Sequence, residues 1–180
     1  MTAKEAKIKL MYWYLRSGRF IATLTEMQLF SMFIADMVVV DEDFITMEVE
    51  IKTSLSDLWT ELNCIKKWKK ELELNYPTAK FAKHNTYLDQ ILKTEGNTNR
   101  YFIPNKFYFA VAGEDLLKDA RKELEGTPYG LVFLREATGA VFDPEVIIQG
   151  KRLHDNPLDK EFLRGILKRM SWENHNLLSR

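Results

Sequence analysis

A chain of 180 residues, 46% hydrophobic and 29% charged, has the size and composition of one globular domain, which excludes the disordered and fibrous classes. Its 26 lysines and arginines balance 26 aspartates and glutamates, so no net charge draws the whole molecule to nucleic acid or to an anionic membrane. The longest apolar run, 27–40, is too short to span a bilayer, and the single cysteine, Cys64, excludes an internal disulfide and a thiolate zinc cluster.

The first third of the chain predicts a helix, three strands and a second helix. Two segments repeat apolar residues every three or four positions, and the segments between them are rich in branched and aromatic residues. Ser54 and Asp57 form the S-x-x-D pattern that opens helices. The predicted elements are a helix over 3–17, strands over 20–26, 34–40 and 44–52, the last two a hairpin around the acidic turn 41–43, and a helix over 55–70.

The rest of the chain predicts a strand, helix, strand unit. Residues 106–111 and 131–134 are short strand-like runs, and the charged helical stretch 114–125 between them ends at Gly126. Such a unit is parallel, so the fold class is α/β: a central mixed β-sheet flanked by α-helices. The remaining expected elements are a helix over 79–92, a polar loop over 94–99, an edge strand over 141–148 broken by Pro144, and a last helix that begins at Asn156 and Pro157.

Several common catalytic motifs are absent. No pair of glycines forms G-x-G and no G-x-x-x-x-G-K occurs, so neither a dinucleotide turn nor a nucleotide-phosphate loop is encoded. G-x-S-x-G and H-E-x-x-H are missing too, which removes the signatures of α/β-hydrolases and zinc proteases. Cys64 lies among apolar helix positions and is therefore interpreted as a buried structural thiol.

The predicted strand over 44–52 carries ionisable groups on one face. Side chains alternate along a strand, so Glu48, Glu50 and Lys52 share one side while Met47, Val49 and Ile51 share the other. The apolar side would anchor the strand to the core. A slip of one residue would bury all three charges, so the register is strongly specified.

Asp36 stands alone in the apolar strand that precedes this one. An ionised carboxylate in such a setting needs a strand edge, a cation or several donors around it. If Asp36 approaches Glu50 across the hairpin, two hard anionic oxygens converge, and this is the ligand type that Mg²⁺ prefers. Lys52 could then act on a water or on the charge of a scissile phosphate. A lone E-x-K triplet is otherwise weak, since Glu5 and Lys7 form another.

This pattern resembles a known superfamily. Asp36, thirteen intervening residues and Glu50-Ile51-Lys52 resemble the motif of the restriction-endonuclease-like PD-(D/E)XK nucleases, with Ala35 at the position of the named proline. Further segments resemble small bacterial and phage nuclease-like proteins, some associated with DNA repair. These segments are EVEIKTSLSD over 48–57, KH over 83–84, NKFYFAV over 105–111, YGLVFL over 129–134 and KRLH over 151–154.

The resemblance implies a restriction-endonuclease-like core and a Mg²⁺ or Mn²⁺ site. In that site Asp36 and Glu50 would be metal ligands, Ile51 would offer its backbone carbonyl, and Lys52 would be catalytic together with the two acids. Glu48 and Glu26 are the additional acidic candidates, Glu26 as the acid that many members place on an early element.

A basic stretch follows the expected site. Seven basic residues occur within nineteen positions, and they would either form a solvated helix face or position DNA through its phosphates. They are Lys66, Lys67, Lys69, Lys70, Lys80, Lys83 and His84. Packing in the core or on the surface is expected for Trp68 and Tyr87, with stacking on bases as the alternative.

The sequence thus predicts a single-domain, Mg²⁺-dependent nuclease that hydrolyses DNA, with DNA repair or phage DNA metabolism as its expected setting. The spacing does not distinguish DNA from RNA, and no helix suited to reading bases is evident, so low sequence specificity is expected. Cutting both strands would call for two sites and would favour a homodimer. With no signal peptide and no spanning segment, a cytoplasmic location without membrane contact is expected. The alternatives are a noncatalytic nucleic-acid-binding or assembly module on a nuclease fold, and a protein-interaction domain.

Overall fold

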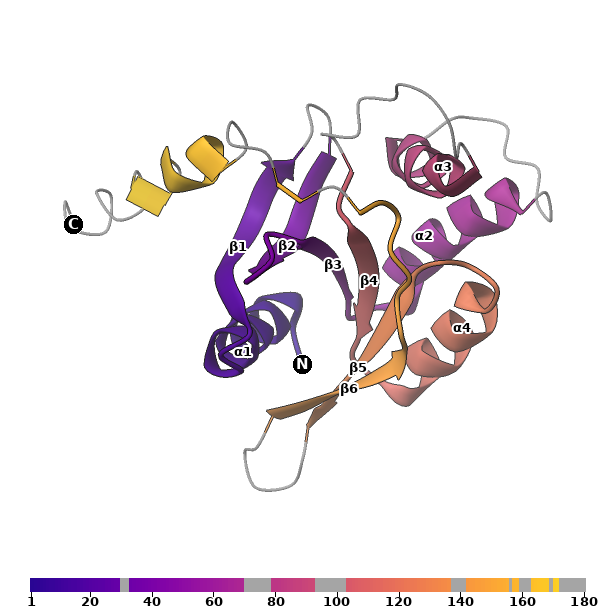
Figure 1. Ribbon diagram of the computed structural model, residues 1–180. Helices are drawn as coiled ribbons and strands as arrows, with labels where there is room; N and C mark the ends of the chain where they lie inside the picture. The colour runs from indigo at the N-terminus through magenta and orange to yellow at the C-terminus, as the bar shows by residue number, and fades with distance from the viewer. Residues whose placement is uncertain are drawn as a thin grey trace.

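Six strands form one sheet whose spatial order, β1-β2-β3-β4-β5-β6, follows the chain (Figure 1). The computed structural model describes residues 1–29, 33–69, 79–92, 103–136, 142–155, 157–158, 163–168 and 170–171. The strands are β1 (Phe20–Leu29), β2 (Phe33–Asp41), β3 (Thr46–Lys52), β4 (Lys106–Val111), β5 (Gly130–Glu136) and β6 (Phe142–Ile148). The helices are α1 (Ala3–Arg16), α2 (Leu55–Trp68), α3 (Ala79–Leu92) and α4 (Glu114–Leu124).

The sheet is mixed, as the sequence predicted. Strands β1, β2 and β3 are antiparallel neighbours, β3, β4 and β5 run parallel, and β6 returns antiparallel to β5. The predicted hairpin is thus β2–β3, and the predicted parallel unit is β4–α4–β5. The expectation that Pro144 breaks the last strand is wrong, because Pro144 lies within β6 opposite Leu134. At the edge of a sheet a proline costs no ladder hydrogen bond when its missing N–H faces away from the neighbour.

Local signals account for the ends of the helices. Thr2 and Glu5 form a capping box at the start of α1, and the Ser54 hydroxyl accepts a hydrogen bond from the Asp57 amide at the start of α2. Gly126, with φ of 78°, follows α4 in the left-handed conformation that glycine adopts freely. The expected loop over 94–99, as well as Asn156 at the start of the expected last helix, lies outside the described residues.

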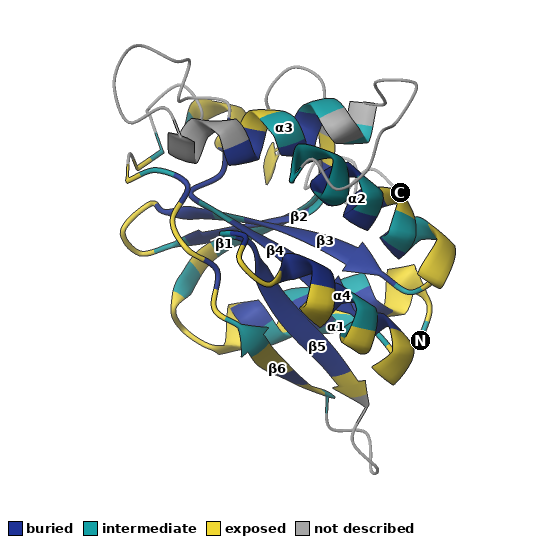
Figure 2. Cartoon of the chain, turned by 90° about the vertical axis from the view of Figure 1, so that its right-hand side faces the viewer, coloured by how far each residue is buried: buried dark blue, intermediate teal, exposed yellow. Residues whose placement is uncertain are grey.

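Helices cover both faces of the sheet. On one face, α1 packs Leu10 and Tyr14 against residues of β2, β3, β4 and β5. On the other face, α2, α3 and α4 pack on Phe107 and Phe109 of β4 and on residues of β5 (Figure 1). Figure 2 shows β3, β4 and most of β5 buried between these layers. Residue Cys64 of α2 is buried, as predicted.

The chain returns to its first strands near its end. Residues 163–168 are helical, and Ile166 packs on Leu24 of β1 and on Val38 and Val40 of β2. The amide of Leu158 donates to the carbonyl of Phe44, in the turn between β2 and β3. Among the described residues, no helix is both long enough and apolar enough to cross a bilayer.

Candidate active site

Strand β3 presents Glu48, Glu50 and Lys52 to the face that α2 and α3 cover. Their residues are 1%, 5% and 3% exposed, so both faces of β3 are buried. The sequence correctly predicted that these three side chains share one face and that Val49 and Ile51 lie on the other, apolar face. It did not predict that the charged face is buried as well, which is possible because α2 and α3 supply charges of opposite sign.

Six ionisable side chains are buried together in this layer, and we call them the buried charge cluster. They pair carboxylates with ammonium or imidazole groups, so that each charged or polar end has a partner within the cluster or at its border. The members are Glu48, Glu50 and Lys52 of β3, Glu61 of α2, and Lys83 and His84 of α3. Isolated charges at such depth would be strongly destabilising, and pairing makes their burial tolerable.

The ammonium of Lys52 donates to three carboxylates. Its Nζ lies 3.4 Å from Glu50 Oε2, 3.1 Å from Asp57 Oδ2 and 3.2 Å from Glu61 Oε1. Burial opposes the charged form of Lys52, but these three carboxylates outweigh it and raise the pKa of its ammonium. Lys52 is therefore a charged donor at neutral pH and not a base that removes a proton from water.

Lys83 lies between the other two carboxylates of β3. Its Nζ is 3.3 Å from Glu48 Oε1 and forms a short ion pair with Glu50 Oε1. The hydroxyl of Tyr87 donates to Glu48 Oε2 at 2.7 Å. Burial raises the pKa of Glu48 to about 7 against the attraction of Lys83, whereas Lys83 and Lys52 overcome burial and lower the pKa of Glu50. The negative charge of the pair is thus concentrated on Glu50.

His84 lies between Glu61 of the cluster and Tyr129 of the neighbouring core. Its Nε2 is hydrogen-bonded to Glu61 Oε2, and its Nδ1 lies 3.0 Å from the hydroxyl of Tyr129. Burial lowers the pKa of His84, and the carboxylate of Glu61 opposes this without reversing it. A neutral ring that donates from Nε2 to Glu61 and accepts at Nδ1 from Tyr129 satisfies all three groups.

Asp36 lies where the pairing of β2 with β3 ends. The last ladder pair is Met37 with Val49, and beyond it Asp36 Oδ2 accepts a hydrogen bond of 2.9 Å from the amide of Ile51. Asp36 Oδ1 lies 3.2 Å from the ammonium of Lys7, which α1 contributes. The carboxylate thus has a cation, one of the alternatives that allow it in an apolar strand, and a backbone donor as well.

The predicted acids are close enough to affect one another. Burial raises the pKa of Asp36, and the negative charge of Glu50 raises it further. Lys7 also forms an ion pair with Glu26, the exposed acid of β1, and so joins Glu26 to Asp36. The side chain of Asp36 is 29% exposed, against 7% for Glu50 and 3% for Lys52. Solvent therefore reaches this group of residues at Asp36.

The donor set fits a hard divalent cation. In a β-strand the N–H and C=O groups of one residue project toward the same neighbouring strand. The N–H of Ile51 points toward β2, where it donates to Asp36, so the carbonyl of Ile51 also points toward β2. The ladder between β2 and β3 has already ended there, at Met37 and Val49. With Asp36 and Glu50 this gives two carboxylates and one carbonyl, a set that suits Mg²⁺, which usually keeps several waters. In the described part of the chain, no three acidic, histidine or cysteine side chains are grouped so that they could hold a metal.

The predicted basic residues do not share one surface. Lys66 pairs with Glu123 of α4 at 3.1 Å, and Lys69 donates to the Glu123 carbonyl at 2.9 Å, so both tie α2 to α4. Lys67 is partly exposed, and Lys70 lies outside the described residues.

The α3 members of the basic set lie in the buried charge cluster or at its border. Lys80 pairs with Asp57 at 2.8 Å and with Glu61 at 2.9 Å, at the border of the cluster. Lys83 and His84 were expected to face nucleic acid, but the structure places them 4% and 0% exposed inside the cluster. Tyr87 is buried beside them, as the packing interpretation expected.

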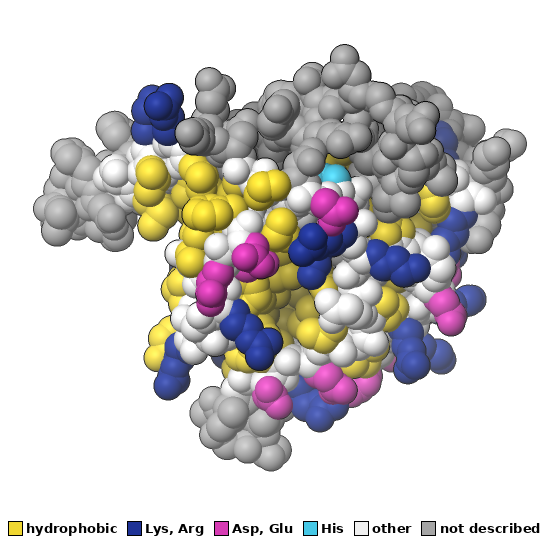
Figure 3. All heavy atoms as spheres, in the orientation of Figure 1, with side chains coloured by type: hydrophobic (Ala, Val, Ile, Leu, Met, Phe, Trp, Pro, Cys, Tyr) yellow, Lys and Arg dark blue, Asp and Glu magenta, His cyan; other side chains and the backbone are white. Residues whose placement is uncertain are grey.

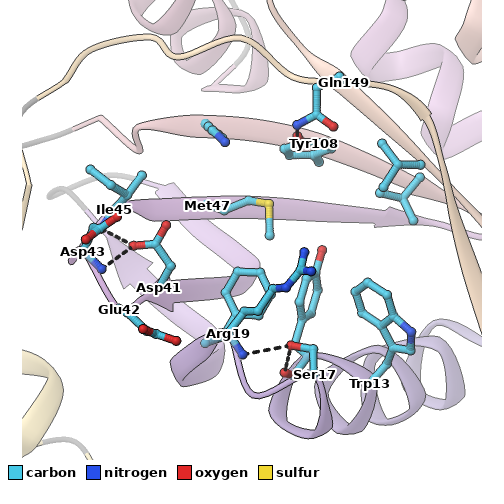
Figure 4. A pocket seen from close by; sticks show the side chains of 15 residues that line it. Trp13, Ser17, Arg19, Asp41, Glu42, Asp43, Ile45, Met47, Tyr108 and Gln149 are labelled. Carbon is cyan, nitrogen blue, oxygen red and sulfur yellow. Dashed lines mark hydrogen bonds between the residues drawn. The ribbon is translucent and has the colours of Figure 1, made fainter.

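A cavity of about 670 Å³ lies on the opposite face of the sheet from the cluster. Figure 3 shows an apolar hollow on this side of the molecule with acidic and basic side chains around it. In Figure 4, Trp13 projects from α1, Asp41 and Met47 come from the β2–β3 hairpin, and Tyr108 of β4 lies beyond them. Arg19 extends from the end of α1 toward the sheet. This hollow is thus separate from the predicted site.

Sequence reasoning missed four members or neighbours of the site. Asp57 and Glu61 lie four residues apart on one side of α2, and Tyr87 lies four residues after Lys83 on α3. This helical spacing is a readable signal, but Asp57 is interpreted from the sequence only through the helix cap and the family resemblance. Tyr129 had no signal, because its contact with His84 joins residues 45 apart in the chain.

Comparisons with known proteins show the fold alone. No protein-family model and no curated protein matches this chain. A solved structure of a protein of unknown function from Silicibacter pomeroyi is similar, with 13% identity and a TM-score of 0.55 over 99% of this chain and 90% of that one.

Proposed function

We propose that this chain is a Mg²⁺- or Mn²⁺-dependent nuclease with a restriction-endonuclease-like core, and that it hydrolyses phosphodiester bonds of DNA. The observation that carries the proposal is the 2.9 Å hydrogen bond from the Ile51 amide to Asp36. It brings the acid of β2 against the middle residue of Glu50-Ile51-Lys52, although fifteen positions separate them in the chain. The mixed sheet with helices on both faces supports the same core.

Asp36, Glu50 and the Ile51 carbonyl would hold the metal. When bound, a divalent cation there would supply a nucleophile at neutral pH and neutralise charge on the phosphate. Asp36 is the member that solvent reaches, so the scissile phosphate would approach from its side. The ammonium of Lys7 donates to Asp36 Oδ1 and would have to move away from that oxygen for a metal ion to bind there.

Lys52 would stabilise developing negative charge. Its ammonium is fixed by Glu50, Asp57 and Glu61, and a fixed donor needs no reorganisation when charge develops beside it. The raised pKa of Lys52 keeps it protonated, which suits electrostatic stabilisation and excludes a role as general base near neutral pH.

The test is cleavage of supercoiled and single-stranded DNA, with RNA in parallel, in Mg²⁺ or Mn²⁺. Asp36→Asn keeps an acceptor for the Ile51 amide but removes the charge, and it should reduce cleavage by about 100-fold or more. Asp43→Asn, in the exposed turn after β2, is the matched control and should cut like the wild type. Equal cleavage by the Asp36 and Asp43 variants would contradict the proposal.

A second candidate is a noncatalytic nucleic-acid-binding or assembly module on the same fold. The observation in its favour is that both oxygens of Glu50 already have lysine partners, Lys83 and Lys52. Wild-type protein that binds DNA without cutting it in either metal would support this candidate. Protein that neither cuts nor binds DNA would favour a protein-interaction domain instead.

A further inference from the structure

The cavity between α1 and the sheet combines apolar walls with a few polar groups. Phe20, Met47 and Val132 contribute to its apolar lining, and Trp13 stands at one side (Figure 4). Its volume of about 670 Å³ lies in the range of pockets that hold small organic molecules. In such pockets the apolar walls supply contact area and the polar groups orient the ligand. The polar groups therefore indicate which kind of molecule would fit.

The hydroxyl of Tyr14 is a buried donor without an acceptor. Tyr14 lines the cavity and is 3% exposed, and its hydroxyl forms no hydrogen bond with any described residue. In the described part of the chain, Thr23 Oγ1 is the only unpaired polar side-chain atom that is wholly closed off, so the Tyr14 oxygen must reach the space of the cavity. Burial and the neighbouring Tyr108 raise the pKa of Tyr14, which keeps its proton. A ligand that carries an acceptor would satisfy this donor.

Tyr108 offers a second proton to the same cavity. Its hydroxyl accepts hydrogen bonds from the Gln149 side chain at 2.8 Å and from the Gly150 amide at 3.1 Å, so both of its acceptor positions are filled. The proton of this hydroxyl has no acceptor among the described residues. Burial raises the pKa of Tyr108, so this hydroxyl also remains a donor. Two phenol protons are therefore available to an acceptor in the cavity.

The charged groups of the lining favour an anionic head group at one end. Two cations, Arg19 and Lys106, and the acids of the hairpin turn at 41–43 line the cavity. Figure 4 shows these acids together at the hairpin, where Asp41 Oδ1 accepts from the amide of Asp43 at 3.0 Å. The side chain of Arg19 extends toward the sheet and forms no ion pair with a described residue. An anion would thus be repelled from the hairpin end and attracted to Arg19.

We propose that this cavity binds a small organic acid with an apolar body, whose carboxylate accepts hydrogen bonds from the hydroxyls of Tyr14 and Tyr108 and pairs with Arg19. The apolar body would lie against Met47 and Val132. Hydrogen bonds to a carboxylate are stronger than those to a neutral acceptor, which favours an acid over a ketone or an amide. The inference is independent of the proposed function, because the cavity and the predicted site lie on opposite faces of the sheet.

The experiment is a calorimetric titration of the whole protein with 4-butylbenzoate. Three analogues change one property each: 4-butylbenzamide has no charge, 4-butylbenzylamine has a positive charge, and benzoate lacks the butyl chain. We expect 4-butylbenzoate to bind with a Kd below about 1 mM, and each analogue to bind at least about 10-fold more weakly. No binding of 4-butylbenzoate overturns the inference, and so does binding of the amide or the amine that is equally tight or tighter.

Tyr14→Phe tests the phenol donor. It removes the hydroxyl and keeps the ring, so it should raise the Kd of 4-butylbenzoate by about 10-fold. Without ligand its Tm should equal or exceed that of the wild type, because the hydroxyl has no partner among the described residues. Tyr12→Phe is the matched control on α1, since Tyr12 is 60% exposed and does not line the cavity, and it should bind like the wild type. Unchanged affinity in Tyr14→Phe would place the ligand elsewhere and overturn the inference.

Arg19→Gln tests the ion pair. It should weaken the binding of 4-butylbenzoate by about 10-fold and leave the binding of the neutral 4-butylbenzamide unchanged, because only the acid pairs with the guanidinium. Arg16→Gln is the matched control: the guanidinium of Arg16 lies 5.3 Å from the centre of the Tyr12 ring and does not line the cavity. This control should bind both ligands like the wild type. An Arg19→Gln variant that binds the acid as the wild type does, or that loses both ligands equally, would contradict a carboxylate at Arg19.

Discussion

At the scale of single residues, His84 shows how burial sets a charge state. The ring is 0% exposed, and its two nitrogens face Glu61 and Tyr129. A neutral imidazole matches both partners, whereas a protonated one would place a second donor against the Tyr129 hydroxyl. The lowered pKa of His84 means that the unfolded chain takes up a proton near pH 6.5 that the folded chain does not.

His84 should therefore make the protein less stable in mild acid. Below about pH 6.5 the unfolded state binds more protons than the folded state at this residue, so its contribution to the free energy of unfolding falls as the pH falls. His84→Gln can keep both hydrogen bonds without titrating. Between about pH 7.5 and about pH 5.5, urea unfolding should show a smaller loss of the free energy of unfolding for His84→Gln than for the wild type.

Burial raises the pKa of Glu48, so over part of this pH range Glu48 increases the free energy of unfolding as the pH falls. This contribution is present in both the wild type and His84→Gln. Comparing the two pH dependences removes it, because only the difference between wild type and His84→Gln is read. If the free energy of unfolding changed equally with pH in both proteins, His84 would not lose its proton on folding.

At the scale of elements, Tyr108 joins β4 to the start of β5 and the end of β6. Its ring covers Gly130 and Gly150, and its hydroxyl accepts from the Gln149 side chain at 2.8 Å and from the Gly150 amide at 3.1 Å. A Cβ on Gly130 would overlap the Tyr108 ring. The close approach of these segments thus depends on the absence of a side chain at Gly130.

Gly130→Ala is expected to lower the free energy of unfolding by about 1–3 kcal/mol, because the ring must move within a packed layer. Gly165→Ala is the control: that glycine is helical, and an added Cβ would meet nothing within 4 Å. The control should be neutral or should gain up to about 1 kcal/mol from helix propensity. Chemical denaturation of both variants measures the difference, and equal stabilities would refute the close-packing argument.

At the scale of the whole molecule, the last described residues return to the first two strands of the sheet. Ile166 is 4% exposed against Leu24, Val38 and Val40, whereas its neighbour Leu167 is 62% exposed. The residues after β6 thus cover an apolar area that α2, α3 and α4 do not.

Ile166→Ala is expected to cost about 2 kcal/mol of stability, whereas Leu167→Ala should change it by less than about 0.5 kcal/mol. Ile166→Ala should also be cut sooner by a protease in the C-terminal segment, because that segment would leave β1 and β2 more often. Urea unfolding and limited proteolysis of the two variants provide the measurement. Equal behaviour would mean that residue 166 contributes nothing to the contact.

Periodicity predicted the elements well where one local pattern decided the outcome. The apolar spacing and the Ser54 cap of α2, the branched residues of β2 and the helix at 79–92 all lie within a few residues of their predicted bounds. The alternation along β3 also placed Glu48, Glu50 and Lys52 on one face. These features depend on neighbours in the chain, and the sequence shows those directly.

The surroundings of the site could not be predicted in the same way. The burial of Glu50 depends on Lys83, which is 33 residues away, and the hydrogen bond of Asp36 to Ile51 depends on where β2 stops pairing with β3. The sequence assigns Lys83 and His84 to a DNA-facing surface because they belong to a basic stretch that directly follows the predicted site. The long-range pairing with Glu48, Glu50 and Glu61 reversed that assignment.

The apolar hollow between α1 and the sheet has a practical consequence for the folded protein. Met47, Tyr108 and Trp13 line a space of about 670 Å³ in the native fold. A fluorescent dye that binds exposed apolar surface can therefore bind there before any unfolding occurs. Dye uptake is commonly taken as the mark of a loosened, molten state. In this protein, brightness with such a dye would be a property of the intact molecule.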